Sequence, residues 1–445
     1  MLKTFPKGGI HPPENKLSSG KPVEVLPLPE MVTILLSQHI GAPSAARVKV
    51  GDRVKTGQVI ADSTGFVSAN IHSSVSGTVK KVDAFPDVSG YKRMAVQIAV
   101  EGDEWEEGID TSDTLKTEII DNVEDIVNKI TAAGIVGLGG ASFPVHVKLS
   151  VPPGKKAEII VINGVECEPY LTCDHRLMLE KGPEIMVGIQ ILMKALNVNK
   201  AVVGVENNKP DAIANLQKCA SDYKGIEICP LMVKYPQGGE KQLIKAVTGR
   251  EVSSGKIPVD VGVVPFNIAT AFAVYEAVQK NKPLVDRLIT VTGKGLAHPS
   301  NFKVRIGTSI NYLIEAAGGM PATVGKVVSG GPMMGKALGT TDIPTTKGCS
   351  GILLMDENES RRKPTCNCIR CAKCVAVCPM GLEPYLLMPL AEQQLFDRAE
   401  TEHVADCIEC GSCSYTCPSN RPLLDYIRLG KATVLKNIRE RATVK

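Results

Sequence analysis

The C-terminal part of the chain contains the sequence CIRCAKCVAVCP from Cys368 to Pro379 and the sequence CIECGSCSYTCP from Cys407 to Pro418. Both sequences follow the spacing Cys-x2-Cys-x2-Cys-x3-Cys-Pro. Three thiolates at this spacing wrap three corners of an iron–sulfur cubane, and the fourth cysteine, before proline, usually ligates the other cluster. The paired motifs therefore predict two [4Fe–4S] clusters and a role in electron transfer.

This rule divides the eight cysteines into two crossed ligand sets. One predicted set is Cys368, Cys371, Cys374 and Cys417, and the other is Cys407, Cys410, Cys413 and Cys378. A pair of zinc sites is the competing interpretation, and the doubled spacing with proline disfavours it. Cys366 lies outside the pattern and is interpreted as a spectator. Apolar residues between the motifs predict helices of the α-helical ferredoxin type, namely Leu386, Leu387, Leu390 and Leu395.

Length and charge set the outer limits of the prediction. A chain of 445 residues predicts about three domains or more. The formal net charge of +4 gives no electrostatic case for nucleic acid as a partner. The first residues lack the apolar region of a secretory signal, and no stretch approaches the roughly 20 apolar residues needed to cross a bilayer. We expect a cytoplasmic location and only peripheral membrane contact.

Short apolar runs punctuated by glycine predict a small antiparallel sandwich near the N-terminus. The runs are residues 47–54, 57–61 and 72–79. Their pattern resembles the barrel-sandwich fold of biotinyl and lipoyl carrier domains. Those domains carry a modified lysine at a hairpin tip, and residues 63–68 here contain no lysine. The segment is therefore interpreted as a scaffold, with a swinging cofactor as the less favoured alternative.

The centre of the chain alternates predicted strands and helices, which indicates a Rossmann-like parallel α/β sheet. The strands are expected at residues 158–162, 201–205 and 226–232, and the helices at 183–196, from 210, and at 239–247. Ligands of such sheets bind beyond the carboxyl ends of the strands. Those ends carry polar and glycine residues at 163–168, 206–208 and 235–240, which predicts a cofactor site there.

Individual residues near these strand ends are weaker signals. The glycine-rich stretch from Gly137 to Pro144 can cradle a phosphate with backbone N–H groups, although such stretches are often only tight turns. Lys148 is either a phosphate partner or a solvated surface lysine. Glu166 and Glu168 either face one pocket or are exposed loop acids.

The remaining segments complete a four-domain prediction. A β-rich unit follows from about Leu288 to Leu338, and residues 357–364 are typical of a polar linker. Residues 423–441 predict a basic amphipathic helix, either packed beside the clusters or in contact with a membrane or partner. The predicted domains are residues 1–110 (barrel-sandwich hybrid), 111–286 (flavin and nicotinamide domain), 287–345 (β-grasp module) and 356–445 (ferredoxin domain).

Four motifs occur in the order of the FMN- and NADH-binding subunit of respiratory complex I. They are GLGGASFPVHVK at 137–148, VINGVECEP at 161–169, GGEKQLIKAVTG at 238–249 and FNIAT at 266–270. With the N-terminal sandwich, the β-grasp module of the SLBB type and the two-cluster ferredoxin, the whole chain resembles the RnfC family of the Rnf complex. Leu138, Gly239 and Ala269 depart from the usual Arg, Glu and Glu of the complex I motifs.

The resemblance implies a cofactor site of twelve residues. It implies FMN contacts for Gly137, Gly139, Gly140, Lys148, Asn163, Glu166, Gly238, Asn267 and Thr270, and nicotinamide contacts for Phe143, Glu168 and Glu240. No side chain is assigned as a catalytic group.

The resemblance also implies a function. FMN would exchange a hydride with NAD(H) and pass single electrons to the clusters. The chain would be an oxidoreductase subunit of an ion-translocating ferredoxin:NAD⁺ oxidoreductase, peripheral on the cytoplasmic face of the cell membrane. Its partners would be integral membrane subunits and a ferredoxin-like iron–sulfur subunit, with ferredoxin acting indirectly.

Two other functions remain open at this point. A soluble cobalamin reductase of the propanediol-utilisation type shares nearly the same domains. An electron-relay adapter without flavin is the other, because three residues depart from the flavin-site motifs.

Overall fold

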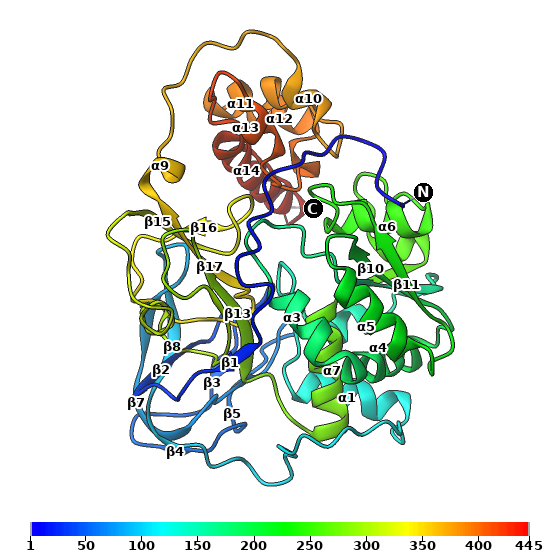
Figure 1. The fold of residues 1–445 in the computed structure, drawn as a ribbon, viewed down its shortest axis with the longest axis vertical. Helices are drawn as coiled ribbons and strands as arrows, with labels where there is room; N and C mark the ends of the chain where they lie inside the picture. Colours follow the sequence, from blue (N-terminus) through cyan, green and yellow to red (C-terminus); the bar gives the residue numbers. More distant parts are fainter. Residues whose placement is uncertain (1, 444–445) are drawn as a thin grey trace.

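The computed structural model describes residues 2–443 and shows four packed units (Figure 1). Residue 1 and residues 444–445, the outer ends of the first and last predicted domains, lie outside the described residues. The sandwich and the β-grasp sheet lie together on one side of the molecule, the α/β unit lies beside them, and the helical cysteine domain lies at one end.

The N-terminal unit is the expected antiparallel sandwich. One sheet has the order β2-β8-β7-β4 and the other β3-β5-β6. Alternate residues of β2, such as Val32 and Ile34, are buried and meet Ile60, Ile71 and Ile98 in a common core, as period-two alternation requires. The strands are β2 (Met31–Leu35), β3 (Ala45–Ala46), β4 (Arg53–Val54), β5 (Val59–Asp62), β6 (Ile71–His72), β7 (Ser76–Pro86) and β8 (Lys92–Gly102).

The α/β unit contains a parallel sheet of order β11-β10-β9-β12. The sequence predicted three of these strands, and the fourth, β12, lies at the edge, where Pro265 is tolerated because an edge strand leaves one side unpaired. The strands are β9 (Ile159–Asn163), β10 (Ala201–Glu206), β11 (Ile226–Leu231) and β12 (Val263–Asn267).

Helices cover this sheet with apolar faces. The close approach of α4 and α7 requires Gly188, since a Cβ there would lie 1.9 Å from the Ala271 carbonyl oxygen. The helices are α1 (Val123–Ala132), α2 (Val145–Leu149), α3 (Cys173–Glu180), α4 (Gly182–Leu196), α5 (Pro210–Ala220), α6 (Glu240–Thr248) and α7 (Ile268–Lys280), with a 3₁₀ turn at Pro258–Val261.

The β-grasp unit is a mixed sheet of order β1-β14-β13-β17-β15-β16. Helix α8 (Ile310–Ala316) packs on it through Ile310, Leu313 and Ile314. The strands are β1 (Val23–Val25), β13 (Asp286–Thr292), β14 (Ser300–Arg305), β15 (Val324–Ser329), β16 (Lys336–Ala337) and β17 (Gly351–Asp356).

The first 25 residues connect the units. Ile10 bridges to Tyr235, the Gly9 N–H donates to the Val377 carbonyl over 2.9 Å, and β1 pairs with β14. The sandwich strands begin only at Met31, and the β-grasp sheet includes β17 at 351–356. The domain boundaries at residues 110, 286 and 345 remain predictions.

The cysteine domain is helical. Helix α14 buries Leu423, Ile427 and Val434 against the helices that the sequence predicted between the cysteine motifs. Lys431 on its basic side donates to the Cys407 carbonyl over 2.7 Å, so α14 packs beside the cysteines. The helices are α9 (Glu357–Ser360), α10 (Lys373–Ala376), α11 (Pro384–Glu392), α12 (Phe396–Thr401), α13 (Ser412–Thr416) and α14 (Leu423–Thr443), with a 3₁₀ turn at Val404–Asp406.

Within residues 2–443, no helix combines the length and the apolar character that crossing a membrane requires.

Candidate functional site

The glycine loop from Gly137 to Pro144 lies where β9 and β12 end. The Gly137 N–H bonds to the Phe143 carbonyl over 2.9 Å and closes the loop, while the buried Thr270 hydroxyl accepts a bond from the Leu138 N–H over 3.0 Å. Gly139 and Gly140 are exposed, and among residues 2–443 their N–H groups have no hydrogen-bond partner. Free N–H groups on two adjacent glycines suit a phosphate.

Asn267 holds this loop from the start of α7. Its Oδ1 accepts from the Ala269 N–H over 2.8 Å and caps the helix. A Cβ on Gly139 would lie 2.6 Å from Asn267 Nδ2, so only glycine fits against this amide. The same Nδ2 donates to Asp174 Oδ2 over 2.8 Å. The side chain therefore links the loop, α7 and α3.

Asn163, at the end of β9, holds the Gly238 segment. Its Nδ2 donates to the Gly238 carbonyl over 2.9 Å, and the Gly238 N–H lies 3.3 Å from Cys167 Sγ. Four predicted FMN residues, Gly139, Asn163, Gly238 and Asn267, are thus brought to one edge of the sheet.

Lys148 and Glu240 lie across the same edge. Lys148 Nζ donates to the Pro265 carbonyl over 3.0 Å and lies 3.7 Å from Glu240 Oε2. Burial lowers the pKa of Lys148, and Glu240 acts against this shift. The lysine is held at the site, which disfavours its interpretation as a solvated surface residue.

Glu166 and Glu168 point to different places. Glu166 accepts from the N–H groups of Asp174 (2.7 Å) and His175 (3.2 Å) and so caps α3. Glu168 accepts from the N–H groups of Met333 (3.1 Å) and Met334 (2.7 Å) in the loop before β16. Burial raises the pKa of Glu168 to about 7. The structure does not bring the two carboxylates into one pocket.

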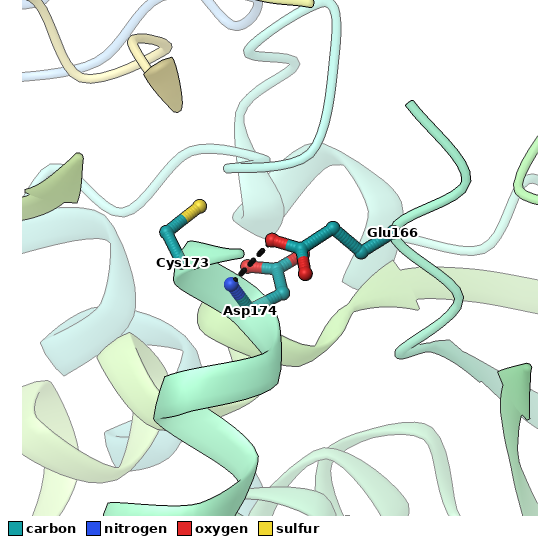
Figure 2. A group of neighbouring side chains, drawn as sticks. All are labelled: Glu166, Cys173 and Asp174. Carbon is teal, nitrogen blue, oxygen red and sulfur yellow. Dashed lines mark hydrogen bonds between the residues drawn. The ribbon is translucent and has the colours of Figure 1, made fainter. Parts of the chain in front are cut away.

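Glu166, Cys173 and Asp174 form the one group of three possible metal ligands within 4.8 Å of one another that residues 2–443 contain (Figure 2). Figure 2 shows the Glu166 carboxylate over the first turn of α3, bonded to the Asp174 N–H. Because the carboxylates are engaged by helix N–H groups and by Asn267, the group is explained as a helix cap. Burial, followed by the Glu166 charge, raises the pKa of Asp174 to about 7.

The four cysteines of the second predicted ligand set line one apolar pocket. Cys378, Cys407, Cys410 and Cys413 face it together with Leu382, Leu387, Leu424 and Ile427. A cysteine from the first motif thus joins three from the second. Burial raises the pKa of the Cys407 thiol to about 11 and that of Cys413 to about 12, so both are neutral at pH 7 until a metal displaces the proton.

The grouping of the cysteine sulfurs can be compared with the geometry of a zinc site. Tetrahedral zinc with bonds of about 2.3 Å places its sulfurs about 3.8 Å apart. Among residues 2–443, no three cysteine sulfurs lie within 4.8 Å of one another.

The other four cysteines differ more widely in their exposure. Cys368 and Cys371 are exposed, whereas Cys374 is buried and close enough to Cys417 for its charge to raise the Cys374 pKa, after the larger effect of burial. The backbone of Cys366 donates to the Ser419 carbonyl over 2.9 Å and keeps the segment beside Cys417. Ligation by these two sets of four cysteines remains our proposal.

Sequence reasoning missed Lys16, Arg287 and Asp174, and it included Tyr235 only as part of the stretch 235–240, without a role. Lys16 donates to the carbonyls of Glu166, Glu168 and Leu171 at 2.7–2.9 Å. Buried Arg287 donates to the Leu138 carbonyl over 3.3 Å. Asp174 orients Asn267, and Tyr235 donates to the Cys410 carbonyl over 2.9 Å. Only Asp174 had a local signal in the sequence, because an acidic residue is common in the first turn of a helix.

The three departures from the complex I motifs have local explanations. Leu138 and Ala269 are 3% and 6% exposed and belong to the core. Gly239 begins α6, where a Cβ would meet the Gln242 side chain at 2.6 Å.

The arrangement defines a class: a multidomain iron–sulfur flavoprotein in which a flavin site and a two-cluster domain share one chain. Comparison with families agrees. Residues 3–104 match the RnfC barrel sandwich hybrid domain, 130–276 the Nuo51 FMN-binding domain, 288–337 the SLBB domain and 360–418 the 4Fe-4S dicluster domain. These matches support the predicted fold class and cofactors.

Relatives extend over the whole chain. The chain is 47% identical to the C subunit of the proton-translocating ferredoxin:NAD(+) oxidoreductase complex of Clostridium ljungdahlii, covering 97% of this chain and 94% of that one. It is 44% identical to the C subunit of the Na(+)-translocating ferredoxin:NAD(+) oxidoreductase complex of Acetobacterium woodii, covering 98% of each. The chain belongs to the RnfC family of Rnf complex subunits.

Among solved structures, an NAD⁺-reducing [NiFe]-hydrogenase in the air-oxidized state aligns with 70% of this chain and 66% of that chain, at 18% identity and a TM-score of 0.49. This TM-score is too low to support a functional comparison.

Proposed function

We propose that this chain is the NAD(H)-facing electron-transfer subunit of an ion-translocating ferredoxin:NAD⁺ oxidoreductase complex. The observation that carries the proposal is that the α/β unit, which holds the glycine-loop site, contacts the cysteine domain of the same chain through the buried hydrogen bond from Tyr235 to Cys410. Relatives from two organisms, both named as subunits of ferredoxin:NAD(+) oxidoreductase complexes, support it.

The residues present fit FMN. The exposed N–H groups of Gly139 and Gly140 and the Lys148 ammonium would hold its phosphate end, and Asn163 and Asn267 would orient it. FMN, when bound, supplies the conversion between a two-electron hydride and single electrons. The chain itself keeps the glycine loop, Asn163 and Asn267 in place. It also holds the cysteine pocket against the α/β unit.

Nicotinamide contacts for Phe143, Glu168 and Glu240 remain part of the proposal. Glu240 shares the sheet edge with Lys148 and supports such a role. Glu168 accepts hydrogen bonds from the N–H groups of Met333 and Met334. Its contribution would therefore be to fix the loop before β16.

The complex-level part of the proposal concerns partners and location. The subunit would bind integral membrane subunits and a ferredoxin-like iron–sulfur subunit, and would reach ferredoxin through them, at the cytoplasmic face of the membrane. Membranes that contain the partner subunits should retain the chain, and membranes without them should release it.

A cofactor inventory combined with reduction by NADH tests the electron-transfer role. The full chain reconstituted with iron, sulfide and FMN should bind all three, and NADH should bleach the flavin absorbance and produce the EPR signals of reduced clusters. Flavin and clusters that stay oxidised with NADH would contradict the proposal. A chain that binds no FMN would instead be a flavin-free relay, and reduction of cob(III)alamin without membrane partners would indicate a cobalamin reductase.

A further inference from the structure

The two predicted ligand sets differ in their access to solvent. In the set formed by Cys378, Cys407, Cys410 and Cys413, two members are buried and two are half-buried, inside a pocket walled by apolar side chains. In the other set, Cys368 and Cys371 are exposed. One ligand set therefore lies in the interior. The other reaches solvent through Cys368 and Cys371, while its Cys417 is half-buried and its Cys374 is buried.

The inner set is also the one joined to the α/β unit. Tyr235, which is 2% exposed, packs with Ile10 and Cys410 in one apolar cluster and donates to the Cys410 carbonyl. An electron that leaves the flavin site through this contact meets the inner set first. The outer set is then the terminal that faces another molecule.

The segment that carries Cys368 and Cys371 is strongly basic. Residues 361–373, which we call the outer basic segment, are all exposed and contain no acidic residue. Its cations are Arg361, Arg362, Lys363, Arg370 and Lys373. In Figure 1 the segment before α10 runs from α9 over the outer end of the helical domain.

These charges are mostly unneutralised by the chain itself. Arg362 pairs with Asp425 over 2.6 Å. Within residues 2–443, the other four cations of the segment form no ion pair. Ile369, which lies between Cys368 and Cys371 in the sequence, adds an apolar side chain that is 68% exposed. An exposed segment that combines unpaired cations with one exposed apolar side chain is suited to an acidic protein surface.

We propose that the outer basic segment is the docking surface for an acidic one-electron carrier protein, and that electrons cross there between the carrier and the cluster of the outer set. The inference rests on the proposed function, because it uses the predicted clusters. An anionic membrane surface would also be attracted, but docking there would place lipid, which accepts no electron, over the most exposed cysteines.

The test uses the reconstituted full chain, with a small acidic bacterial ferredoxin standing in for the ferredoxin-like iron–sulfur subunit that the proposed function names as the partner. The variant Arg361→Glu/Lys363→Glu reverses two unpaired charges outside the cysteine motif. The matched control, Lys80→Glu/Lys92→Glu, makes the same change in net charge on exposed residues of the sandwich. Iron content and far-UV circular dichroism verify that both variants are folded, and Arg361→Gln/Lys363→Gln is a milder second variant.

Binding of the ferredoxin and its rate of electron transfer are measured at low and high salt. At low salt, the segment variant should lose about tenfold or more in association rate and most of its salt dependence, as expected when electrostatic steering is removed. The control should follow the unmodified chain. Equal rates in the two variants, or a rate that rises with salt, would overturn the proposal.

Two further measurements keep the outcomes distinct. NADH-driven flavin reduction should be unchanged in the segment variant, so failure of that step in the unmodified chain would count against the proposed function and not against the surface. Vesicles containing phosphatidylglycerol are the second probe. If the segment variant loses vesicle binding but keeps normal electron transfer with ferredoxin, the segment is a membrane contact and the docking proposal is wrong.

Discussion

Tyr235 and Cys410 connect the two halves of the predicted electron route. The Tyr235 hydroxyl donates to the Cys410 backbone carbonyl over 2.9 Å, inside an apolar cluster that also contains Ile10. Burial raises the pKa of Tyr235 well above its usual value, so the hydroxyl keeps its proton and remains a donor. The bond fixes the cysteine domain against the end of the α/β sheet.

Replacing Tyr235 by Phe should weaken this junction. The substitution leaves the Cys410 carbonyl buried without its donor, at a cost of about 1–3 kcal/mol. We expect a lower melting temperature and a changed EPR spectrum of the inner cluster, with iron content retained. Tyr415→Phe is the matched control, because Tyr415 is 53% exposed and should change neither quantity. Identical melting and spectra for both variants would show that the bond does not fix the junction.

Cysteine double variants distinguish crossed from sequential ligation. Under crossed ligation, Cys378→Ala/Cys407→Ala removes two ligands of one cluster, and about half of the iron should remain, since the other cluster is untouched. Cys371→Ala/Cys378→Ala should damage both clusters. Sequential ligation within each motif predicts the reverse pattern.

Iron and labile sulfide per chain are the measurement for these variants. Cys366→Ala serves as the control, because Cys366 is exposed and lies outside the motif, and it should retain all the iron. Loss of iron in that control would mean that the spectator interpretation of Cys366 is wrong.

The sequence predicted the structure most accurately where chemistry fixes the spacing of residues along the chain. Four cysteines at x2-x2-x3 intervals must bend around a cluster, and strands that alternate with helices must build a parallel sheet, so these features follow from local pattern. The glycine loop was identified from its motif, but its partner Asn267 comes from a distant strand end.

The sequence could not predict the directions of Glu166 and Glu168. Residues two apart share a face only in a regular strand, and Glu166 has φ of +47°. This left-handed residue turns the chain, so one carboxylate caps α3 and the other reaches Met333 and Met334. The path of the first 25 residues was equally hidden, because β1 pairs with β14 through long-range contacts that no local pattern encodes.

Two glycines of the loop should respond differently to alanine. A Cβ at Gly139 would lie 2.6 Å from Asn267 Nδ2, whereas a Cβ at Gly140 would have no protein atom within 4 Å. Gly139→Ala should therefore lower both stability and FMN affinity, the affinity by about tenfold or more, equivalent to about 1.4 kcal/mol. Gly140→Ala should leave stability unchanged and lower only FMN affinity, because its methyl group enters the space proposed for the phosphate.

FMN fluorescence titration and thermal unfolding measure the two effects. Gly65→Ala is the control, since Gly65 has open space around it in the sandwich and lies far along the chain from the loop. If Gly140→Ala binds FMN as tightly as the unmodified chain, the exposed N–H groups do not cradle the phosphate.

Asp174 gives a pH-dependent prediction with a definite sign. Its pKa is raised from 3.8 to about 7, first by burial and then by the Glu166 charge. Below about pH 4 the group is protonated in both the folded and the unfolded state and has no effect. Between pH 4 and pH 7 the unfolded state releases the Asp174 proton while the folded state still holds it, so the free energy of unfolding falls as the pH rises. Above pH 7 both states are ionised, and the loss of stability stays constant.

Asp174→Asn removes this cost while keeping an acceptor for Asn267 Nδ2. The variant should therefore gain stability relative to the unmodified chain, by about 1–2 kcal/mol near pH 5 and by up to about 4 kcal/mol above pH 7, where the gain should level off. Thermal unfolding between pH 5 and pH 8 measures it, with exposed Asp222→Asn as the control for losing one negative charge. A gain that is the same at every pH would mean that Asp174 is ionised throughout, because only a proton held by the folded state makes the difference depend on pH.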